Sequence, residues 1–503
     1  MKAVEKYGIF ETVLDTGENE GAVAGRAVFQ NGNIVKEVSA FLNRAGEYIV
    51  RFMPEEEGVW NYKITIGDIE ESGEFLCTIN TGNNHGSVQT SGYHFCYADQ
   101  SRYIPIGTTC YAWTNQTKGL QDETIETLRC TPFNKIRMCV FPKSMPYNHN
   151  DPEHYPFFKK SDDSWDVENP DPVFWENMDK RLCQLMELGI EADLILFHPY
   201  DRWGFAELTQ EESVTYLAYC IARFGAYRNI WWSLANEYEV LYAKSMEDWD
   251  EYGRILKEKD VFSHLISIHN IIAPYPKREW MTHCSIQSGD IHRIIFWKKE
   301  YKLPVIIDEC GYEGNLQYNW GNLTAFEMVH RFWWTICRNG FCTHGETFHR
   351  DDEVLWWAKG GKLYGESIKR IQFLKEILYS LPGDWRATEA AAGNPNMDGK
   401  DEVAVRQEMR FQEMLKNSPK TGRETFIENI SPMALEGDTY RLEYLGRFRP
   451  FQTELYLPEE GDYRVEIIDI WEMTRKTAFE NVRGYIKVRL PEKEGIAVLA
   501  LKM

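Results

Sequence analysis

Two acidic residues that each end a short apolar run are the strongest candidates for chemistry in this sequence. The run Ile230–Leu234 leads to Asn236 and Glu237, and the run Pro304–Asp308 leads to Glu309. Two carboxyl groups that flank one bond are what glycoside cleavage requires, one as acid/base and one as nucleophile. A separation of roughly 5–5.5 Å lets the second group reach the anomeric carbon itself, so we expect that spacing between Glu237 and Glu309.

Other polar and aromatic side chains follow further apolar runs, and we expect them to line the same site. The acid of the pair needs a raised pKa, which burial against Trp would give, and the nucleophile needs its charge stabilised, which Arg137 could supply. The expected lining residues are Arg137, His198, Tyr200, Trp203, Trp113, His269, Gln287, His344 and Glu346. Glu346 and Asp308 are kept open as alternatives to Glu309.

Short apolar segments alternate with helical patterns from about residue 90, which predicts βα units and a parallel sheet. Eight repeats within about 290 residues are what a (β/α)₈ TIM barrel needs, and there the catalytic groups lie at the carboxyl ends of the strands. The expected strands are Tyr103–Thr108, Lys135–Phe141, Ala192–Phe197, Ile230–Leu234, Leu265–His269, Cys284–Gln287, Pro304–Asp308 and Phe341–Glu346. A doubly wound sheet is disfavoured, because no Gly-rich phosphate loop follows the first strand.

Helices are expected between most of these strands and after the last one. Val173–Gly189 and Thr324–Gly340 have apolar residues at helical spacing and end in Gly, and Glu366–Asp384 has a strong 3.6-residue period.

Alternating apolar and polar residues flank this region on both sides and predict two antiparallel β-sandwiches. The expected layout is a sandwich over residues 1–85, the catalytic barrel over 90–384 and a second sandwich over 425–503, with Thr81–Gln89 as a linker. Residues from 385 to about 435 are polar and are expected to be irregular. Neither sandwich carries a paired-carboxylate pattern, so we expect both to be structural modules.

The amino-acid composition limits which partners are expected. The 503 residues have a formal net charge of −21, which disfavours nucleic acid as a partner. Aromatic residues make up 14%, including 17 Trp, which slightly favours carbohydrate. The sequence has no apolar stretch long enough to cross a membrane, no leader pattern, and eleven Cys without a disulfide spacing. We therefore expect a cytoplasmic protein with a carbohydrate substrate and no cofactor or metal.

The strand-end motifs resemble those of the clan of (β/α)₈ retaining glycoside hydrolases that includes the family 5 cellulases and mannanases. Leu234–Tyr238 (LANEY) and Ile306–Tyr312 (IIDECGY) match its Asn-Glu after strand four and its Glu after strand seven. The resemblance implies that Glu237 is the acid/base, that Asn236 binds the sugar 2-hydroxyl and that Glu309 is the nucleophile. It also implies supporting roles for Arg137 and His198.

The three-part layout and Thr343–Thr347 (THGET) more closely resemble a poorly characterised apiosidase-like group of glycosidases. That group pairs an N-terminal immunoglobulin-like domain with the barrel and a C-terminal β-domain. The clan usually has a Tyr after strand six and a Trp after strand eight. This chain offers Gln287 at the first place and His344 or Glu346 at the second, so the sugar stays open.

Three other function classes are compatible with parts of this pattern. A metal-dependent hydrolase would need clustered His ligands, but no HxH motif occurs among the 12 His. A non-catalytic carbohydrate-binding protein would not need carboxylates at both strand ends. A transglycosidase or phosphorylase would look the same as a hydrolase. The long aromatic stretch Pro142–Asn169 could close one end of a cleft, which favours exo-action. Because no leader pattern is seen, we expect a short substrate, a plant-type oligosaccharide or glycoside. The oligomeric state is left open.

Overall fold

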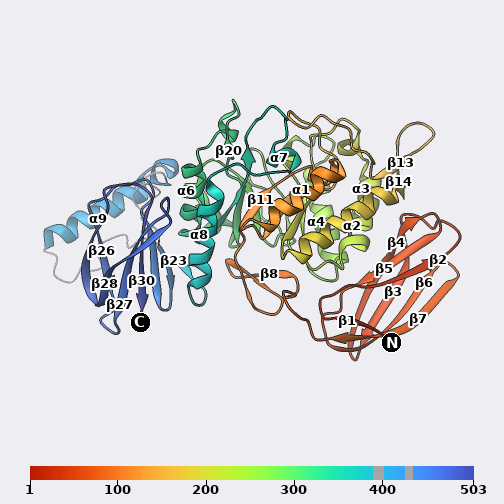
Figure 1. Ribbon diagram of the computed structural model, residues 1–503, viewed down its shortest axis with the longest axis horizontal. Helices are drawn as coiled ribbons and strands as arrows, with labels where there is room; N and C mark the ends of the chain where they lie inside the picture. The colour runs from red at the N-terminus through yellow and green to blue at the C-terminus, as the bar shows by residue number, and fades with distance from the viewer. Residues whose placement is uncertain (389–401, 425–433) are drawn as a thin grey trace. The chain divides into compact units, whose positions relative to one another are not determined.

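The computed structural model describes residues 1–388, 402–424 and 434–503, which form two compact units (Figure 1). The first unit consists of Met1–Gly289, Tyr301–Leu323 and Cys342–Gly365, and the second of Asp290–Glu300, Thr324–Phe341 and Glu366–Met503.

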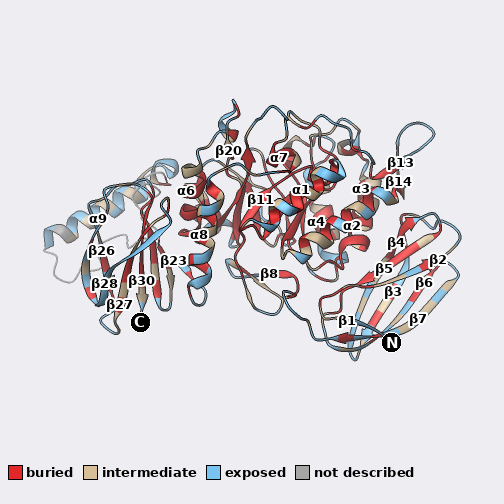
Figure 2. Cartoon of the chain, viewed as in Figure 1, coloured by how far each residue is buried: buried red, intermediate tan, exposed pale blue. Residues whose placement is uncertain are grey.

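Eight parallel strands form a barrel in the spatial order β17-β16-β15-β12-β11-β21-β19-β18. A parallel bridge between His269, just after β17, and Ser285 in β18 joins the two ends of this sheet. The strands are β11 (Gly107–Thr109), β12 (Lys135–Cys139), β15 (Glu191–Phe197), β16 (Ile230–Ala235), β17 (Ile266–Ser267), β18 (Cys284–Gln287), β19 (Val305–Glu309) and β21 (Phe341–His344). The predicted TIM barrel is confirmed, and its strands are buried (Figure 2).

The first barrel strand differs from the prediction. Tyr103 belongs to β10 (Arg102–Tyr103), which pairs with β9 (His94–Tyr97) in a small antiparallel sheet completed by β8 (Val88–Ser91). Pro105 lies between β10 and β11, and because Pro has no N–H to donate it separates the two strands. The expected linker therefore already contains the start of β8.

Helices follow most barrel strands in the chain. Side chains cap the starts of four of them, with Asp171 on α2, Thr324 on α6, and capping boxes of Thr209 with Glu212 on α3 and of Ser245 with Asp248 on α4. The helices are α1 (Lys118–Arg129), α2 (Pro172–Glu187), α3 (Gln210–Phe224), α4 (Met246–Lys259), α5 (Ile294–Tyr301), α6 (Ala325–Ile336), α7 (Trp356–Lys359) and α8 (Ser367–Ser380).

The N-terminal residues form one seven-stranded sheet in the order β1-β7-β6-β3-β4-β5-β2. Phe10 in β2 stacks on Phe75 in β7 with ring centroids 4.3 Å apart, although β2 and β7 lie near opposite ends of that order. The sheet therefore curls over an aromatic core, as in a sandwich. Its strands are β1 (Lys2–Glu5), β2 (Phe10–Asp15), β3 (Val23–Asn31), β4 (Ile34–Arg44), β5 (Glu47–Phe52), β6 (Gly58–Ile66) and β7 (Ile69–Thr78).

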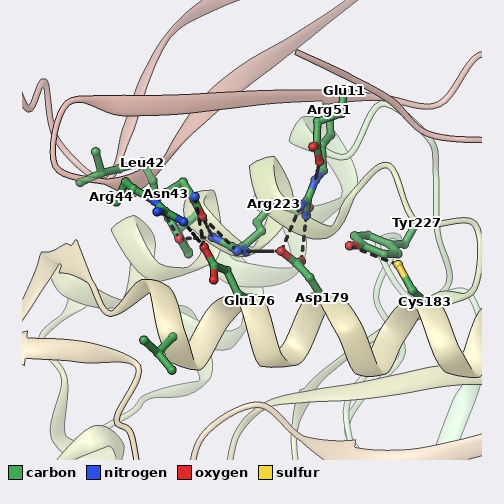
Figure 3. A network of polar contacts seen from close by, with 12 residues as sticks. Glu11, Leu42, Asn43, Arg44, Arg51, Glu176, Asp179, Cys183, Arg223 and Tyr227 are labelled. Atoms are coloured by element: carbon green, nitrogen blue, oxygen red, sulfur yellow. Dashed lines mark hydrogen bonds and ion pairs between the residues drawn. The ribbon is translucent and has the colours of Figure 1, made fainter. Parts of the chain in front are cut away.

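A buried charge network joins this sheet to the barrel helices α2 and α3 (Figure 3). Arg51 of β5 donates to both carboxylate oxygens of Asp179 in α2, at 2.8 and 2.9 Å, and Arg223 of α3 donates to the same carboxylate at 2.6 Å. Burial acts to raise the pKa of Asp179, but the two guanidinium groups lower it below its ordinary value. One carboxylate thus holds two cations from different parts of the unit.

The second unit ends in antiparallel strands. Its six-stranded sheet has the order β23-β24-β25-β30-β27-β28, and β26 pairs with β29. The strands are β23 (Arg386–Thr388), β24 (Ala434–Gly437), β25 (Tyr440–Tyr444), β26 (Gln452–Leu457), β27 (Tyr463–Asp469), β28 (Thr474–Val482), β29 (Gly484–Arg489) and β30 (Ile496–Lys502). The predicted domain limits at 85, 90, 384 and 425 stay predictions, and residues 425–433 lie outside the described residues.

One helix lies where the sequence predicted irregular structure. Helix α9 spans Glu402–Asn417, a segment rich in Glu, Gln, Met and Arg. These residues have high intrinsic helix propensity, and the polarity that suggested a loop belongs to an exposed helix.

No helix among the described residues is long and apolar enough to cross a membrane.

Replacing Asp179 with Ala should lower the free energy of unfolding by about 3–5 kcal/mol, because the change leaves two buried guanidinium groups without their anion. Urea denaturation measures this, and turnover per folded molecule should not change. Glu37→Ala is the control, since Glu37 pairs with Arg26 at the surface, where an ion pair contributes at most about 1 kcal/mol. Equal shifts in the two variants would contradict the account.

Candidate active site

Glu237 lies two residues beyond the end of β16 and has a left-handed backbone, with φ of 54° and ψ of 58°. A non-glycine residue rarely adopts this conformation, and such residues concentrate at functional sites. The neighbouring peptides hold it in place, because Asn236 N donates to Phe197 O at 2.9 Å and Tyr238 N donates to His269 O at 3.0 Å. The strand end thus fixes where the Glu237 carboxyl group points.

Glu309 ends β19 and is bound by a buried cation. Arg137 Nη1 lies 3.2 Å from Glu309 Oε1, and the hydroxyl of Tyr111 donates to the same oxygen. Nη1 also lies 2.9 Å from Asn236 Oδ1 and 3.0 Å from the Tyr111 hydroxyl. The side chain of Glu309 keeps 11% exposure, so the carboxylate is held from within the barrel and still reaches the mouth.

A β-bulge brings Asp308 and Glu309 to the same side of their strand. Ile286 pairs with Ile307 and Gln287 pairs with Glu309, so Asp308 is an extra residue in the ladder. Successive strand residues normally face opposite ways, and a bulge at this position re-aims one of them. Both carboxylates can therefore face the barrel interior.

Asp308 lies in a second polar layer. Lys135 Nζ is 2.7 Å from both Asp308 Oδ1 and Asp193 Oδ2, and Ser285 and Thr343 donate to Asp308 at 2.6 and 2.7 Å. Burial acts to raise the pKa of Asp308, but Lys135 and Arg137 lower it far below its usual range. Asp308 is therefore a satisfied interior anion, and Glu309 is the carboxylate at the mouth.

Two neutral side chains donate hydrogen bonds to Glu237. The Tyr200 hydroxyl donates to Oε2, and the Gln287 amide, oriented with its nitrogen toward the acceptors, donates to Oε1 at 2.9 Å. Burial, followed by the charge of Glu309, raises the pKa of Glu237, while Tyr200, Lys143 and Gln287 act to lower it. Glu237 thus has the surroundings of an acid that keeps its proton, whereas Glu309 is paired with a guanidinium group.

Two predicted histidines are buried and neutral. His198 Nε2 lies 3.2 Å from Phe141 O, and burial lowers the pKa of His198 to about 3. His269 Nε2 lies 3.9 Å from Glu309 Oε1, and burial, followed by Arg137, lowers the pKa of His269 well below its ordinary value. His269 therefore contacts the site, whereas His198 supports the strand beside it.

The two predicted tryptophans differ in exposure. Trp113 is fully buried in the short helix η1 (Trp113–Asn115) after β11. Trp203 is half-buried in the loop after β15, and its Nε1 donates to Asp151 at 2.8 Å. Their assignment as sugar-binding residues stays a prediction.

His344 and Glu346 have partners other than the carboxyl pair, and their assignment as substrate-binding residues stays a prediction. Thr343 points to Asp308 inside the barrel, so the next residue, His344, points outward, where it stacks on Phe133 and lies 3.1 Å from Thr108. No hydrogen bond or ion pair within the described ranges links His344 or Glu346 to Glu237 or Glu309.

Glu346 belongs to a buried group with Glu313 and His344, whose potential ligand atoms lie within 4.8 Å of one another. Both Glu346 oxygens already accept backbone N–H groups, from Tyr364 at 2.6 Å and Gly365 at 2.7 Å. Burial raises the pKa of Glu346 to about 7. The backbone thus satisfies the residue that the sequence kept as an alternative nucleophile.

Three residues of the site were not predicted. Tyr111 follows strand one in TTCYAW, Lys143 follows strand two in FPKSM, and Trp357 lies in α7 with its ring 5.8 Å from that of Tyr111. Tyr111 supplies the phenol on Glu309 that the clan usually places after strand six, and the Trp357 ring comes from beyond strand eight. A single Tyr or Trp in a loop carries no spacing signal, so only their position after barrel strands could have singled them out.

A (β/α)₈ barrel with two carboxyl groups on β16 and β19 is the architecture of barrel glycoside hydrolases. The chain belongs to the apiosidase-like family within this class, because the model of the apiosidase-like catalytic domain matches residues 89–398. Domains of unknown function match on either side, DUF5060 over residues 3–67 and DUF5605 over residues 430–500. No curated protein matches the chain.

Solved structures agree with this family. A "putative glycoside hydrolase" from Bacteroides vulgatus ATCC 8482 is 32% identical over 100% of both chains, with a TM-score of 0.86. A glycoside hydrolase family 5 protein from the same organism is 14% identical over 83% of this chain and 94% of its own, with a TM-score of 0.62, which shows the shared fold. The family and these neighbours support glycoside hydrolase function.

The surroundings of Glu237 generate a pH prediction. An acid must be protonated to act, so kcat/KM should fall as pH rises through the raised pKa of Glu237. Tyr200→Phe removes a hydrogen bond that favours the charged carboxylate, so this fall should move up by about one pH unit. Tyr155→Phe removes a phenol from a different carboxylate, Asp151, and should leave the profile unchanged. A downward or absent shift for Tyr200→Phe would contradict the assignment.

Proposed function

We propose that this protein is a retaining O-glycosidase that cleaves a plant-type oligosaccharide or glycoside from one end, with Glu237 as acid/base and Glu309 as nucleophile. One observation carries the proposal, namely the unequal surroundings of the two carboxyl groups. A guanidinium group and a phenol bind Glu309, whereas Glu237 is buried and accepts hydrogen bonds from the neutral Tyr200 and Gln287.

The mechanism follows from that difference. Glu237 gives its proton to the departing glycosidic oxygen while Glu309 attacks the anomeric carbon, so a covalent glycosyl-enzyme forms and the leaving group departs. Glu237, now ionised, removes a proton from water, which attacks the same carbon and releases Glu309. Arg137 and Tyr111 hold the Glu309 carboxyl group in place for attack and stabilise it again as the leaving carboxylate. The sugar is released with its original anomeric configuration.

The loop after β12 supports action at a chain end. The hydroxyl of Tyr147 donates to Gln317 Oε1 at 3.3 Å, and the Tyr147 ring lies 5.3 Å from that of His349. Gln317 follows β19 and His349 follows β21, so the loop reaches over β11 and β21 at the mouth. A mouth bridged on one side favours a pocket over an open cleft.

Replacing Glu309 with Ala should reduce turnover by roughly three to five orders of magnitude. Glu237→Ala should recover part of its activity with azide or with a substrate that has a good leaving group. A good leaving group departs without a proton from Glu237, and azide attacks the glycosyl-enzyme without a general base. Glu346→Gln tests the alternative nucleophile and should lose far less turnover than Glu309→Ala. NMR should show that the first product keeps the substrate anomer, and an inverted product would refute the mechanism.

A labelled oligosaccharide tests the proposed end-wise action. Chain-end cleavage should release monosaccharide steadily, with the remaining chain shortened one residue at a time. Tyr147→Ala removes the side chain that bridges the mouth and should increase mid-chain cleavage. Early mid-chain products from the unaltered protein would show an open cleft.

A further inference from the structure

Lys143 lies between the two tyrosines that hold the carboxyl pair. Its ammonium nitrogen is 3.4 Å from the ring centroid of Tyr111 and 4.3 Å from that of Tyr200. Tyr111 donates to Glu309 and Tyr200 donates to Glu237. The ammonium group therefore faces the place where the reacting bond must lie.

The loop around Lys143 fixes this position. Ser144 N donates to Tyr200 O at 2.8 Å, and the Asn148 side chain donates to the carbonyl oxygen of Lys143. Lys143 itself is 2% exposed. A long, flexible side chain is thus held in one direction by its backbone and by two aromatic faces.

Lys143 has no anionic partner in the part of the chain that the structure describes. No carboxylate there lies within 4.0 Å of its Nζ, and no group there accepts a hydrogen bond from it. The other buried lysines are satisfied, Lys135 by Asp193 and Asp308 and Lys244 by Ser213 Oγ at 2.8 Å and the carbonyl of Leu208. A buried ammonium without a counter-ion is costly, so a bound anion would stabilise this one.

The neighbouring phenols do not supply the missing charge. Burial, followed by Glu309, raises the pKa of Tyr111, and burial, followed by Glu237, raises that of Tyr200, so both stay neutral donors. Lys143 Nζ also keeps some exposed surface, whereas the unpartnered ring nitrogens of His269 and Nδ2 of Asn236 are fully enclosed. The ammonium therefore keeps a path to a ligand.

We propose that Lys143 binds a carboxylate on the sugar held at the Glu237–Glu309 pair, so that the substrate class is a uronic acid glycoside. The inference rests on the proposed function. The charges of Glu309 and Glu237 act on Lys143 only from beyond ion-pair distance. A neutral hydroxyl would accept one hydrogen bond from the ammonium group, whereas a carboxylate would give it a direct counter-ion. An acidic sugar in this site also needs a cation, because it approaches two carboxyl groups in a chain of net charge −21.

The test uses aryl glycosides of four uronic acids, namely glucuronide, galacturonide, mannuronide and iduronide, as both anomers. Each uronide is compared with the neutral glycoside that differs from it only at C6. The unaltered protein should prefer one uronide, and Lys143→Met should lower the kcat/KM ratio of uronide to neutral glycoside by roughly thirtyfold or more. Lys143→Arg should restore part of that ratio. Lys244→Met, a buried lysine held by neutral oxygens, should leave it unchanged.

The outcomes separate this inference from the proposed function. Preference for neutral glycosides across the panel, or an equal loss on both substrates in Lys143→Met, would overturn the uronate site and leave the glycosidase intact. If Lys143→Met does not fold, two other results test the uronate site. They are the kcat/KM ratio of uronide to neutral glycoside for Lys143→Arg and the preference of the unaltered protein for uronides. If no glycoside of the panel is hydrolysed, calorimetry measures binding of the four free uronic acids. Binding that depends on Lys143 would keep the uronate site and contradict the glycosidase. Absence of uronate binding would overturn the uronate site.

Discussion

One buried guanidinium group, that of Arg137, connects the parts of this site. It rises from β12 and contacts Glu309 of β19, the Tyr111 hydroxyl after β11 and the Asn236 side chain after β16. A cation enclosed in a barrel is tolerated only where anions and hydrogen-bond acceptors offset its desolvation, so these strand ends must converge on it. Lys135 has the same role one layer below, with Asp193 and Asp308. Folding of the barrel and organisation of the site therefore depend on the same charges.

The two carboxyl groups of the site differ because of what surrounds them. Glu309 shares its oxygen with a permanent cation, whereas Glu237 lies on a left-handed backbone among neutral donors and close enough to Glu309 for their charges to interact. An acid and a nucleophile of the same residue type can then take different roles, since burial and the neighbouring Glu309 raise the pKa of Glu237, whereas Glu309 is paired directly with Arg137.

The sequence predicted the barrel and the strand ends, because apolar runs of strand length alternate with helical patterns and end in Asn236-Glu237 and Asp308-Glu309. It did not predict the bulge at Asp308, since an extra residue in a ladder depends on the neighbouring strand and not on local pattern. His344 and Glu346 were placed by sequence at the mouth. The alternation of Thr343 and His344 along β21 instead turns His344 outward, and a backbone turn at Tyr364 and Gly365 binds Glu346. Tyr111 and Lys143 come from loops whose course only the folded barrel determines.

The account depends most on the covalent role of Glu309, and a trapped intermediate tests it directly. The protein would be incubated with activated 2-deoxy-2-fluoro glycosides, which form the glycosyl-enzyme faster than it hydrolyses, and then digested for peptide mass spectrometry. We predict a mass increase of one sugar on the peptide that contains Glu309, absent in Glu309→Gln. A label on Glu237 or Glu346 instead, or turnover of these glycosides with no label on any peptide, would contradict the account.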